Sequence, residues 1–284
     1  MNFTRYLLSL AAALALAAPS FAADEPAKAT QAAAPGAPAH TPGMIHRYSD
    51  LKGFNVENTN GDNLGEIVDV VYDQQSGKVR YAAVSFGGFL GVGDKLFAVP
   101  WSALKHQNDT VNNKHRIVMN ADKASLEKAP GFDADNWPNI ADAAWSAEVD
   151  KFYGDAHGIK QDAGAGPGYR LSKIVGMDVR NDAAENLGEI HDAVIDIDAA
   201  QIRYFAVSFG GFLGVGDKLF AVPFNQVRVA HDAEGNDYHM VMSADKATLE
   251  KAPSFDKSHW PNMADPNWDR EVRDFYGNRA AAQK

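Results

Sequence analysis

Alternating apolar and polar positions predict a β-hairpin in the first half of the chain. Residues 64–72 read LGEIVDVVY, residues 78–86 read KVRYAAVSF, and the polar stretch DQQSG joins them. Two runs rich in β-branched and aromatic residues around a short polar connection are typical of antiparallel strands. Asp73 and Gly77 suit the turn, because aspartate bonds the backbone that follows it and glycine accepts a positive φ. A second hairpin has Ala200 in place of Gly77, so that turn is not expected to need a positive φ.

Further strands follow each hairpin. A glycine-dense segment, GGFLGVGDK, leads into KLFAVPW at residues 95–101, and RIVM at 116–119 is matched by HMVM at 239–242. Five or six short strands with glycine-rich turns, and no alternation with helices, favour a small β-barrel. Closing the sheet would also remove exposed strand edges. The expected class is therefore mainly β.

A short helical tail is predicted after each set of strands. Asn120 and Ser243 suit the N-caps of two short helices, DKASLEKA and DKATLEKA. Longer helices are expected to begin at Asp142 and Asp265 and to end at glycines 154 and 277. Each long helix carries an apolar stripe at i, i+4 and i+7, made of Trp145, Val149 and Phe152 in one and Trp268, Val272 and Phe275 in the other. We expect these stripes to cover the barrels, with a partner-binding groove as the alternative.

The whole pattern is written twice. Residues 48–154 align with 171–277 at a constant offset of 123, without insertion or deletion. The run AVSFGGFLGVGDKLFAVP is identical in the two copies, at 83–100 and 206–223. A repeat of about 107 residues is too long for a solenoid unit and has the size of an independent domain.

The repeat predicts two tandem modules, a first module at 48–154 and a second module at 169–277, with a tail at 278–284. A glycine-rich linker at 155–168 would let the modules reorient, unless they pack together. Residues 23–47 are dominated by alanine and proline and predict a disordered tether.

Residues 1–22 have the order of a secretory signal peptide. Arg5 precedes an apolar stretch that ends near residue 18, and small residues up to Ala22 form the expected cleavage site. The apolar stretch is too short for an ordinary membrane span, and no later stretch reaches the length of one. The chain also contains no cysteine, which excludes thiol catalysis and thiolate metal sites. Export without disulfides fits the bacterial periplasm.

The charge pattern argues against nucleic acid. The formal net charge is −10 and no run of lysine or arginine interrupts it, so a phosphate backbone would be repelled.

Histidine chemistry is not shared by the two modules. None of the histidines within the modules has a histidine at the equivalent position of the other copy: His106, His115, His191, His231, His239 and His259. Metal-binding spacings such as HExxH are also missing, so no metal site or cofactor is predicted. Ser85 and Ser208 are matched but have no matched histidine to activate them, which argues against an enzyme.

Acidic and aromatic residues do recur in both copies. The matched acids are Glu66 with Glu189, Asp69 with Asp192, Asp73 with Asp196, and Asp94 with Asp217. We expect solvated faces, turn caps or ion pairs, with a Ca²⁺-like oxygen site as the alternative. The matched aromatics are Tyr81 with Tyr204, Trp137 with Trp260, and Trp145 with Trp268. Core packing is the expected use, and stacking on a ligand is the alternative.

The two glycine-rich segments are the predicted partner-binding sites. They lack the GxxxxGK[ST] pattern and lie between strands, which argues against a phosphate-binding loop. An apolar tip could instead dock a protein partner, a second copy or a membrane surface, whereas the alternative is that it plugs the barrel end. The predicted site residues are Gly87, Gly88, Phe89, Leu90, Gly91 and Asp94, with Gly210, Gly211, Phe212, Leu213, Gly214 and Asp217 in the second copy.

The order LGEI, a hairpin and VSFGGFLGVGDKLFAVPW resembles the PRC-barrel family, which includes the photosynthetic reaction centre H subunit and the C-terminal domain of the ribosome maturation factor RimM. The resemblance is strongest over residues 48–119 and 171–242 and implies a small six-stranded barrel that acts as a non-catalytic assembly module. The membrane helix of the H subunit and the N-terminal domain of RimM have no counterpart here, so their roles are not carried over.

The sequence therefore predicts a non-catalytic periplasmic scaffold that docks a protein partner through its paired glycine-rich loops. The alternative is a protein that binds a small ligand or a metal ion through the matched acidic and aromatic residues.

Overall fold

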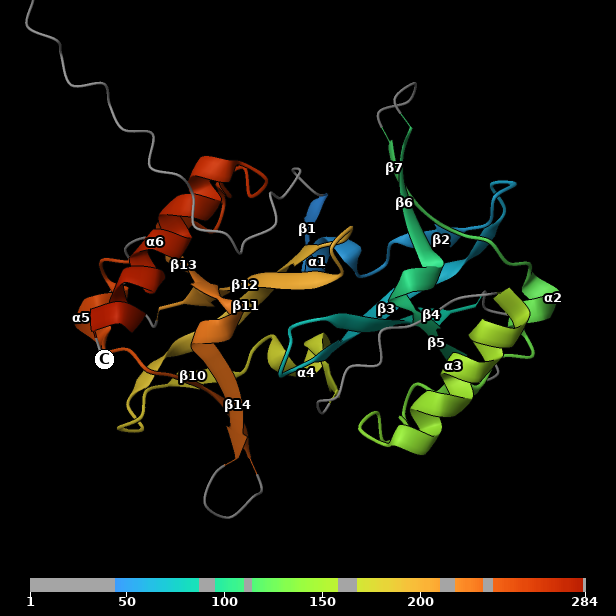
Figure 1. Cartoon of the computed structure of the whole chain (residues 1–284), viewed down its shortest axis with the longest axis horizontal. Coiled ribbons are helices and arrows are strands. Elements are labelled where there is room, and N and C mark those ends of the chain that lie inside the picture. Colours follow the sequence, from blue (N-terminus) through green and yellow to red (C-terminus); the bar gives the residue numbers. More distant parts are fainter. Residues whose placement is uncertain are drawn as a thin grey trace, which may run out of the picture. The chain divides into compact units, whose positions relative to one another are not determined.

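The computed structural model describes residues 44–86, 95–109, 114–157, 168–209, 218–231 and 237–282. These residues form two eight-stranded sheets with short helices around them (Figure 1). The expected mainly β architecture is confirmed. No helix among these residues is long and apolar enough to cross a membrane.

The first sheet contains the hairpin predicted from the alternating pattern. Strands β3 (Asn63–Asp73) and β4 (Val79–Ser85) pair antiparallel, with Glu66 opposite Ser85. The hydrogen-bonded order is β6-β7-β2-β3-β4-β5-β8, and the β2–β7 pair is parallel. The other strands are β2 (Asn55–Glu57), β5 (Lys95–Pro100), β6 (Leu104–Asp109), β7 (Lys114–Met119) and β8 (Gly131–Asp133).

The second sheet repeats this order as β14-β15-β10-β11-β12-β13-β16. Its strands are β10 (Asp178–Arg180), β11 (Asn186–Asp196), β12 (Gln201–Ser208), β13 (Lys218–Pro223), β14 (Val227–His231), β15 (Tyr238–Met242) and β16 (Ser254–Asp256). A short 3-10 helix follows β5 at Trp101–Ala103 and follows β13 at Phe224–Gln226.

The eighth strand of each sheet comes from the other module. Strand β1 (Ile45–Arg47) pairs antiparallel with β11 of the second sheet, and β9 (Gly168–Arg170) pairs antiparallel with β3 of the first. The two pairings have the same register, since His46 faces Ile195 and Tyr169 faces Tyr72. We call this arrangement the strand exchange, with a β1 half and a β9 half. It corrects the extent of the predicted tether, because residues 45–47 form a strand.

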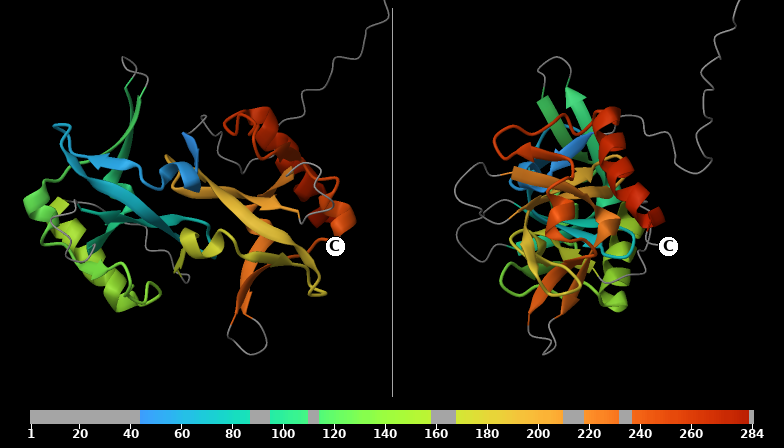
Figure 2. Two further views of the ribbon diagram at one scale, coloured as in Figure 1. Left: turned by 180° about the vertical axis from the view of Figure 1, so that it is seen from behind. Right: turned by 90° about the vertical axis from the view of Figure 1, so that its left-hand side faces the viewer.

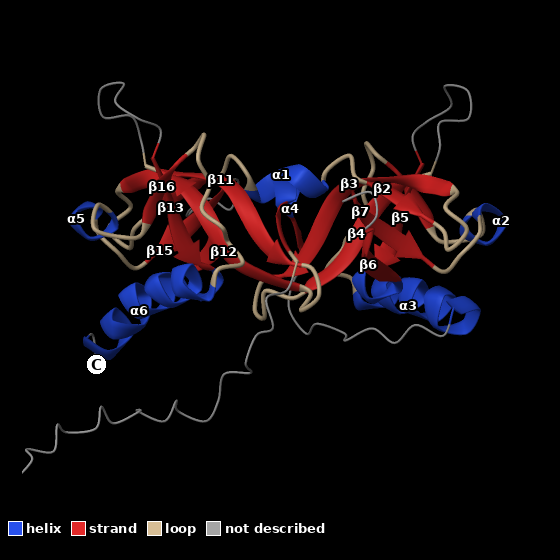
Figure 3. Ribbon diagram, turned by 90° about the horizontal axis from the view of Figure 1, so that it is seen from above, coloured by secondary structure: helices blue, strands red, loops and turns tan. Residues whose placement is uncertain are grey.

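Four short helices follow the exchanged strands and the sheets. Helices α1 (Tyr48–Leu51) and α4 (Leu171–Ile174) lie where the two sheets meet (Figures 1 and 3). Helices α2 (Lys123–Leu126) and α5 (Lys246–Leu249) begin later than predicted. Asp122 and Asp245 are the N-caps rather than Asn120 and Ser243, because each aspartate accepts a bond from the backbone N–H three residues on, at 2.7 and 2.8 Å.

Two longer helices, α3 (Ala143–His157) and α6 (Pro266–Ala282), complete the tails and lie at opposite ends of the paired sheets (Figures 2 and 3). Their predicted starts are confirmed, since Asp142 and Asp265 cap the backbone N–H groups of residues 144 and 267. Their predicted ends are wrong, because both helices continue through glycines 154 and 277. Val149 and Val272 are buried and the other stripe residues pack on the core, as expected for helices that cover a sheet.

The hairpin turns correct a prediction about backbone conformation. Gly77 has φ of +71°, and Ala200 also has a positive φ, of +51°. Ala184 stands where the first copy has Gly61, and these two residues have φ of +61° and +89°. The fold therefore imposes left-handed conformations at equivalent places, even where the second copy has alanine instead of glycine. Alanine adopts this conformation at a cost in backbone strain.

The hydrophobic core is continuous between the two modules. One cluster of buried side chains includes residues of both sheets. Tyr72 of β3 contacts Phe224 and Phe205 of the second module, with ring centroids 6.1 and 6.4 Å apart. The sequence predicts modules that can reorient unless they pack together. The shared core shows that they pack together.

Candidate functional site

One pair of the matched acids, Asp69 and Asp192, holds the strand exchange together. Asp69 is buried in β3 and accepts hydrogen bonds from the Ser172 backbone N–H at 3.1 Å, from the Ser172 hydroxyl and from the Tyr48 hydroxyl at 3.0 Å. Arg170 of β9 completes an ion pair with the same carboxylate at 2.9 Å. A buried carboxylate needs such partners to offset its lost hydration. Asp69 therefore fastens the β9 half.

Asp192 occupies the equivalent place in the β1 half. Its carboxylate accepts from the Ser49 backbone N–H at 3.2 Å and from the Ser49 hydroxyl at 2.6 Å. The arginine of this half, Arg47, forms its ion pair with Asp50 at 2.5 Å instead. The expectation of turn caps or ion pairs is borne out for Asp69, for Asp196, which pairs with Arg203 at 3.7 Å, and for Asp73, which accepts from two backbone N–H groups of its turn. The contacts of Asp69 and Asp192 also join the two modules.

The matched tryptophans take part in the same exchange. The Arg170 guanidinium lies 3.6 Å from the ring centroid of Trp137, and the Arg47 guanidinium lies 5.0 Å from that of Trp260. Each arginine comes from an exchanged strand and each tryptophan from the module that receives it. A guanidinium over an indole face is attractive because the ring face is electron-rich.

The two hairpin turns also meet. The Val79 N–H donates to the Ala200 carbonyl at 2.8 Å, and the Ile202 N–H donates to the Gly77 carbonyl at 2.9 Å. The indole N–H of buried Trp101 donates to the Ile197 carbonyl at 3.0 Å. These bonds add a second line of contact beside the strand exchange.

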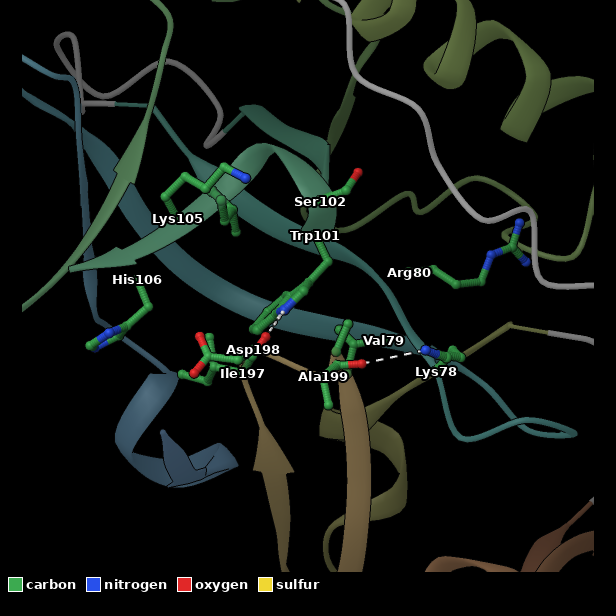
Figure 4. A pocket seen from close by; sticks show the side chains of 12 residues that line it. Lys78, Val79, Arg80, Trp101, Ser102, Lys105, His106, Ile197, Asp198 and Ala199 are labelled. Atoms are coloured by element: carbon green, nitrogen blue, oxygen red, sulfur yellow. Dashed lines mark hydrogen bonds between the residues drawn. The ribbon is translucent and has the colours of Figure 1, made fainter. Parts of the chain in front are cut away.

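A cleft of about 490 Å³ opens beside this turn contact, and we call it the inter-module cleft (Figure 4). Trp101 lies at its centre and the turn around Asp198 forms one wall. Four basic side chains contribute to its lining, against one acidic side chain: Lys78, Arg80, Lys105 and His106, with Asp198. In a chain with a net charge of −10, this is a local concentration of positive charge.

The basic side chains of the cleft differ in how they are engaged. Lys78 donates to the Ala199 carbonyl at 3.4 Å, and Arg80 donates to the Ser146 hydroxyl at 3.3 Å and points away from Trp101 (Figure 4). Lys105 is exposed. Burial and the nearby His115 lower the pKa of His106, so this ring is neutral at pH 7.

Three histidines meet next to the cleft, and we call them the histidine cluster. The ring centroids of His46 and His106 are 5.9 Å apart, those of His46 and His115 are 5.6 Å apart, and those of His106 and His115 are 5.4 Å apart. Sequence reasoning missed this group because His46 lay in the predicted tether and the repeat comparison removed unmatched histidines. No set of three histidine, aspartate or glutamate side chains in the described ranges is arranged to hold a metal ion.

The predicted partner-binding residues lie outside the described residues. This applies to Gly87, Gly88, Phe89, Leu90, Gly91 and Asp94 and to Gly210, Gly211, Phe212, Leu213, Gly214 and Asp217. The strands that flank them are well defined: β4 and β5 pair from Tyr81 opposite Pro100 to Ser85 opposite Leu96, and β12 and β13 pair in the same way. Each segment thus leaves and re-enters the sheet at fixed, equivalent positions.

The comparison with family models matches the PRC-barrel domain over residues 44–126 and 167–246, which is more than half of the chain. The chain belongs to the PRC-barrel domain family. Both matches begin at or just before the exchanged strands, so β1 and β9 lie within the two domains. The comparison with curated proteins finds no match.

PRC-barrel domains are generally non-catalytic scaffold domains and often mediate protein interactions. Two of the matched polar residues form hydrogen bonds within their own module. Tyr81 donates to Asp150 at 3.1 Å, and burial raises its pKa to about 12. Ser208 donates to the Glu189 carbonyl at 3.3 Å within its own sheet. These are contacts that hold the two PRC-barrel domains in shape.

Proposed function

We propose that this protein is a non-catalytic scaffold that docks a protein partner through its two identical glycine-rich segments. The observation that carries the proposal is the reciprocal strand exchange. It joins the two domains into one body and fixes the strand ends from which both segments emerge. A partner that bound both segments would gain avidity, because the second contact would cost little further ordering.

The location we propose for this scaffold is the bacterial periplasm. Support comes from the order of charged, apolar and small residues over 1–22 and from the complete lack of cysteine. Cleavage near Ala22 would release the domains with the Ala/Pro-rich segment at their N-terminal side.

The docking proposal is tested with the double variant Phe89→Asp/Phe212→Asp, the two single variants and wild type. Tyr238→Asp is the matched control, because it adds the same charge at an aromatic residue that is 50% exposed. Each mature protein is immobilised and exposed to a periplasmic extract of the source bacterium. Wild type and the control should retain the same partner, each single variant should bind about 10²-fold more weakly, and the double variant should lose it.

Two results would contradict the docking proposal. A folded double variant that keeps the partner would show that the phenylalanines take no part in docking. A double variant that unfolds, as judged by circular dichroism, would show that both side chains belong to the barrel interior.

A second candidate function is favoured by the inter-module cleft, which could hold a small anionic ligand such as a carboxylate or phosphate. The support is the exposed Lys105, which lines the cleft together with Lys78, whereas Arg80 lines it but points away from Trp101 (Figure 4). Thermal shift with citrate and inorganic phosphate as probes would test it, using Lys105→Glu as the variant and exposed Lys52→Glu as the control. Stabilisation of wild type and the control, but not of Lys105→Glu, is expected. Equal shifts in all three proteins would eliminate the cleft as the site.

A further inference from the structure

The histidine cluster connects the exchanged strand to the module that it leaves. His46 is the central residue of β1, whose backbone pairs with β11 of the second module. Its ring nevertheless contacts His106 of β6 and His115 of β7, both in the first module. Three imidazoles from three strands therefore lie within 6 Å of one another, at the point where the β1 half enters the junction.

The cluster is suited to the neutral form of histidine. Burial and the two neighbouring rings lower the pKa of His46, and burial and His115 lower the pKa of His106. The Nε2 atom of His106 is buried and has no hydrogen-bond partner within the described part of the chain. Two acids oppose this effect in part, Asp50 of α1 facing His46 and Asp198 of the opposite turn facing His106.

Other charges around the cluster are already engaged or are positive. Asp50 is paired with Arg47, and Asp198 accepts from the Met44 backbone N–H at 3.3 Å. Lys105 lines the same cleft as His106 and Asp198, and Arg116 next to His115 is paired with Glu57. If the three rings were protonated, most of the charged groups around them would be positive or already paired. These groups would therefore give the added positive charges little stabilisation.

The β9 half has the same backbone and none of these imidazoles. The residues equivalent to His46, His106 and His115 are Tyr169, Val229 and Tyr238. Tyr169 packs against Tyr72 with ring centroids 6.3 Å apart, and burial raises its pKa further above 10. This half has none of the three imidazoles of the cluster, and the nearest histidine, His231, packs on Tyr238 with ring centroids 4.3 Å apart.

We propose that His46, His106 and His115 form an acid-sensitive latch, which holds β1 in the strand exchange while the rings are neutral and loosens it when they become charged, leaving β9 in place. The sign follows from the lowered pKa of two rings. The open state has ordinary histidines with pKa near 6.5, so it binds more protons than the closed state. The latch is fully closed above about pH 6.5 and weakens as the pH falls through this range.

Hydrogen exchange on the intact mature protein tests the latch, at pH 7.5 and pH 5.0, with EDTA present and with correction for intrinsic exchange rates. The protection of residues 45–47 should fall about tenfold or more at pH 5.0, because the open state binds more protons than the closed state. The protection of residues 168–170 should change by less than about twofold, because that half has no cluster.

The second module supplies the matched control variant. His46→Tyr/His106→Val/His115→Tyr installs the residues of the β9 half, and it should remove the pH response of β1 while keeping its protection at pH 7.5. Titration of the three histidine ring signals by NMR in wild type is a second measurement that does not depend on the variant folding, and two apparent pKa values below 6.5 are expected. The latch is overturned if β1 and β9 respond equally to acid, if the folded variant keeps the response, or if His46 and His106 titrate normally.

Discussion

The two halves of the strand exchange share one backbone arrangement and differ in chemistry. In the β9 half, Asp69 gathers an arginine, a serine and a tyrosine around a buried carboxylate. In the β1 half, Asp192 is bonded to Ser49, while Arg47 is paired with Asp50. The β1 half also carries the histidine cluster. The two copies of a duplicated fold can thus keep the same strand register while different side-chain contacts stabilise each half.

The difference teaches which contacts are required by the fold and which are free to vary. Positive φ angles, registers and capping aspartates recur in both copies. The ion pairs of Arg47 and Arg170 and the ring contacts of His46 and Tyr169 differ between the copies, although other aromatic pairs recur. Substitutions at equivalent positions should therefore have equal effects where the backbone is constrained and unequal effects where side chains have diverged.

The largest expected effect is equal in both copies. A Cβ atom at Gly65 would collide with the Ser85 carbonyl, and one at Gly188 with the Ser208 carbonyl. Gly65→Ala and Gly188→Ala should each lower the free energy of unfolding by about 3 kcal/mol, measured by urea denaturation. Gly53→Ala is the control, since it has a positive φ but open space around it, and it should cost about 1 kcal/mol. Loss in one copy only would show that the two sheets are not constrained alike.

The next effect should separate the two halves. Asp69→Asn removes the partner of Arg170 in a buried ion pair and should cost about 3 kcal/mol. Asp192→Asn removes an acceptor of Ser49 and should cost about 1 kcal/mol. Both values are to be measured by urea denaturation at pH 7.5. Equal losses would mean that the arginine–aspartate pair adds nothing to the β9 half.

Substitutions in the two hairpin turns should have smaller effects on stability. One replaces glycine by alanine and the other replaces alanine by glycine. Gly77→Ala would place a Cβ 2.7 Å from the Phe224 ring and should cost about 2 kcal/mol. Ala200→Gly relieves a left-handed alanine but increases the freedom of the unfolded chain, so it should change stability by less than about 0.5 kcal/mol. Thermal unfolding would detect the first and not the second. A neutral Gly77→Ala would show that Phe224 moves aside.

The last expected loss of stability concerns a bond that only one copy makes. The Trp101 indole donates to the Ile197 carbonyl, whereas the equivalent residue, Phe224, has no such donor. Trp101→Phe should leave that carbonyl without its indole donor and cost about 1 kcal/mol in urea denaturation. A value near zero would indicate that water takes the place of the indole.

Much of the fold could be predicted because its signals are local. The alternation around Asp73 placed β3 and β4 within one residue, and Asp142 and Asp265 placed the starts of α3 and α6. The misplaced caps of α2 and α5 came from choosing Asn120 and Ser243 although an aspartate followed two residues later. Each long helix continues past the glycine at which it was predicted to end, directly after a buried tyrosine, Tyr153 or Tyr276, so glycine is tolerated inside these packed helices.

The candidate sites were harder to predict. Matched residues indicated Asp69, Asp192, Trp137 and Trp260, yet their roles depend on an arginine or serine that arrives from the other module. The histidine cluster was hidden for the same reason, since its members are far apart in the chain and unmatched between copies. The positive φ of Ala200 was missed because residue preference was given more weight than the shared turn geometry.

The sequence by itself determined the duplication, the strand and helix types and the family, because periodicity and repeat length are properties of neighbouring residues. Only the tertiary structure decided which sheet each exchanged strand joins. From the sequence, strand β1 could pair with VYD at residues 71–73 or with VID at residues 194–196, and these two strand segments are nearly identical. The exchanged strands are also alike, because Arg47 and Ser49 are equivalent to Arg170 and Ser172. Neither backbone pairing nor these side chains distinguish the two strand edges, so only the folded chain shows which strand joins which sheet.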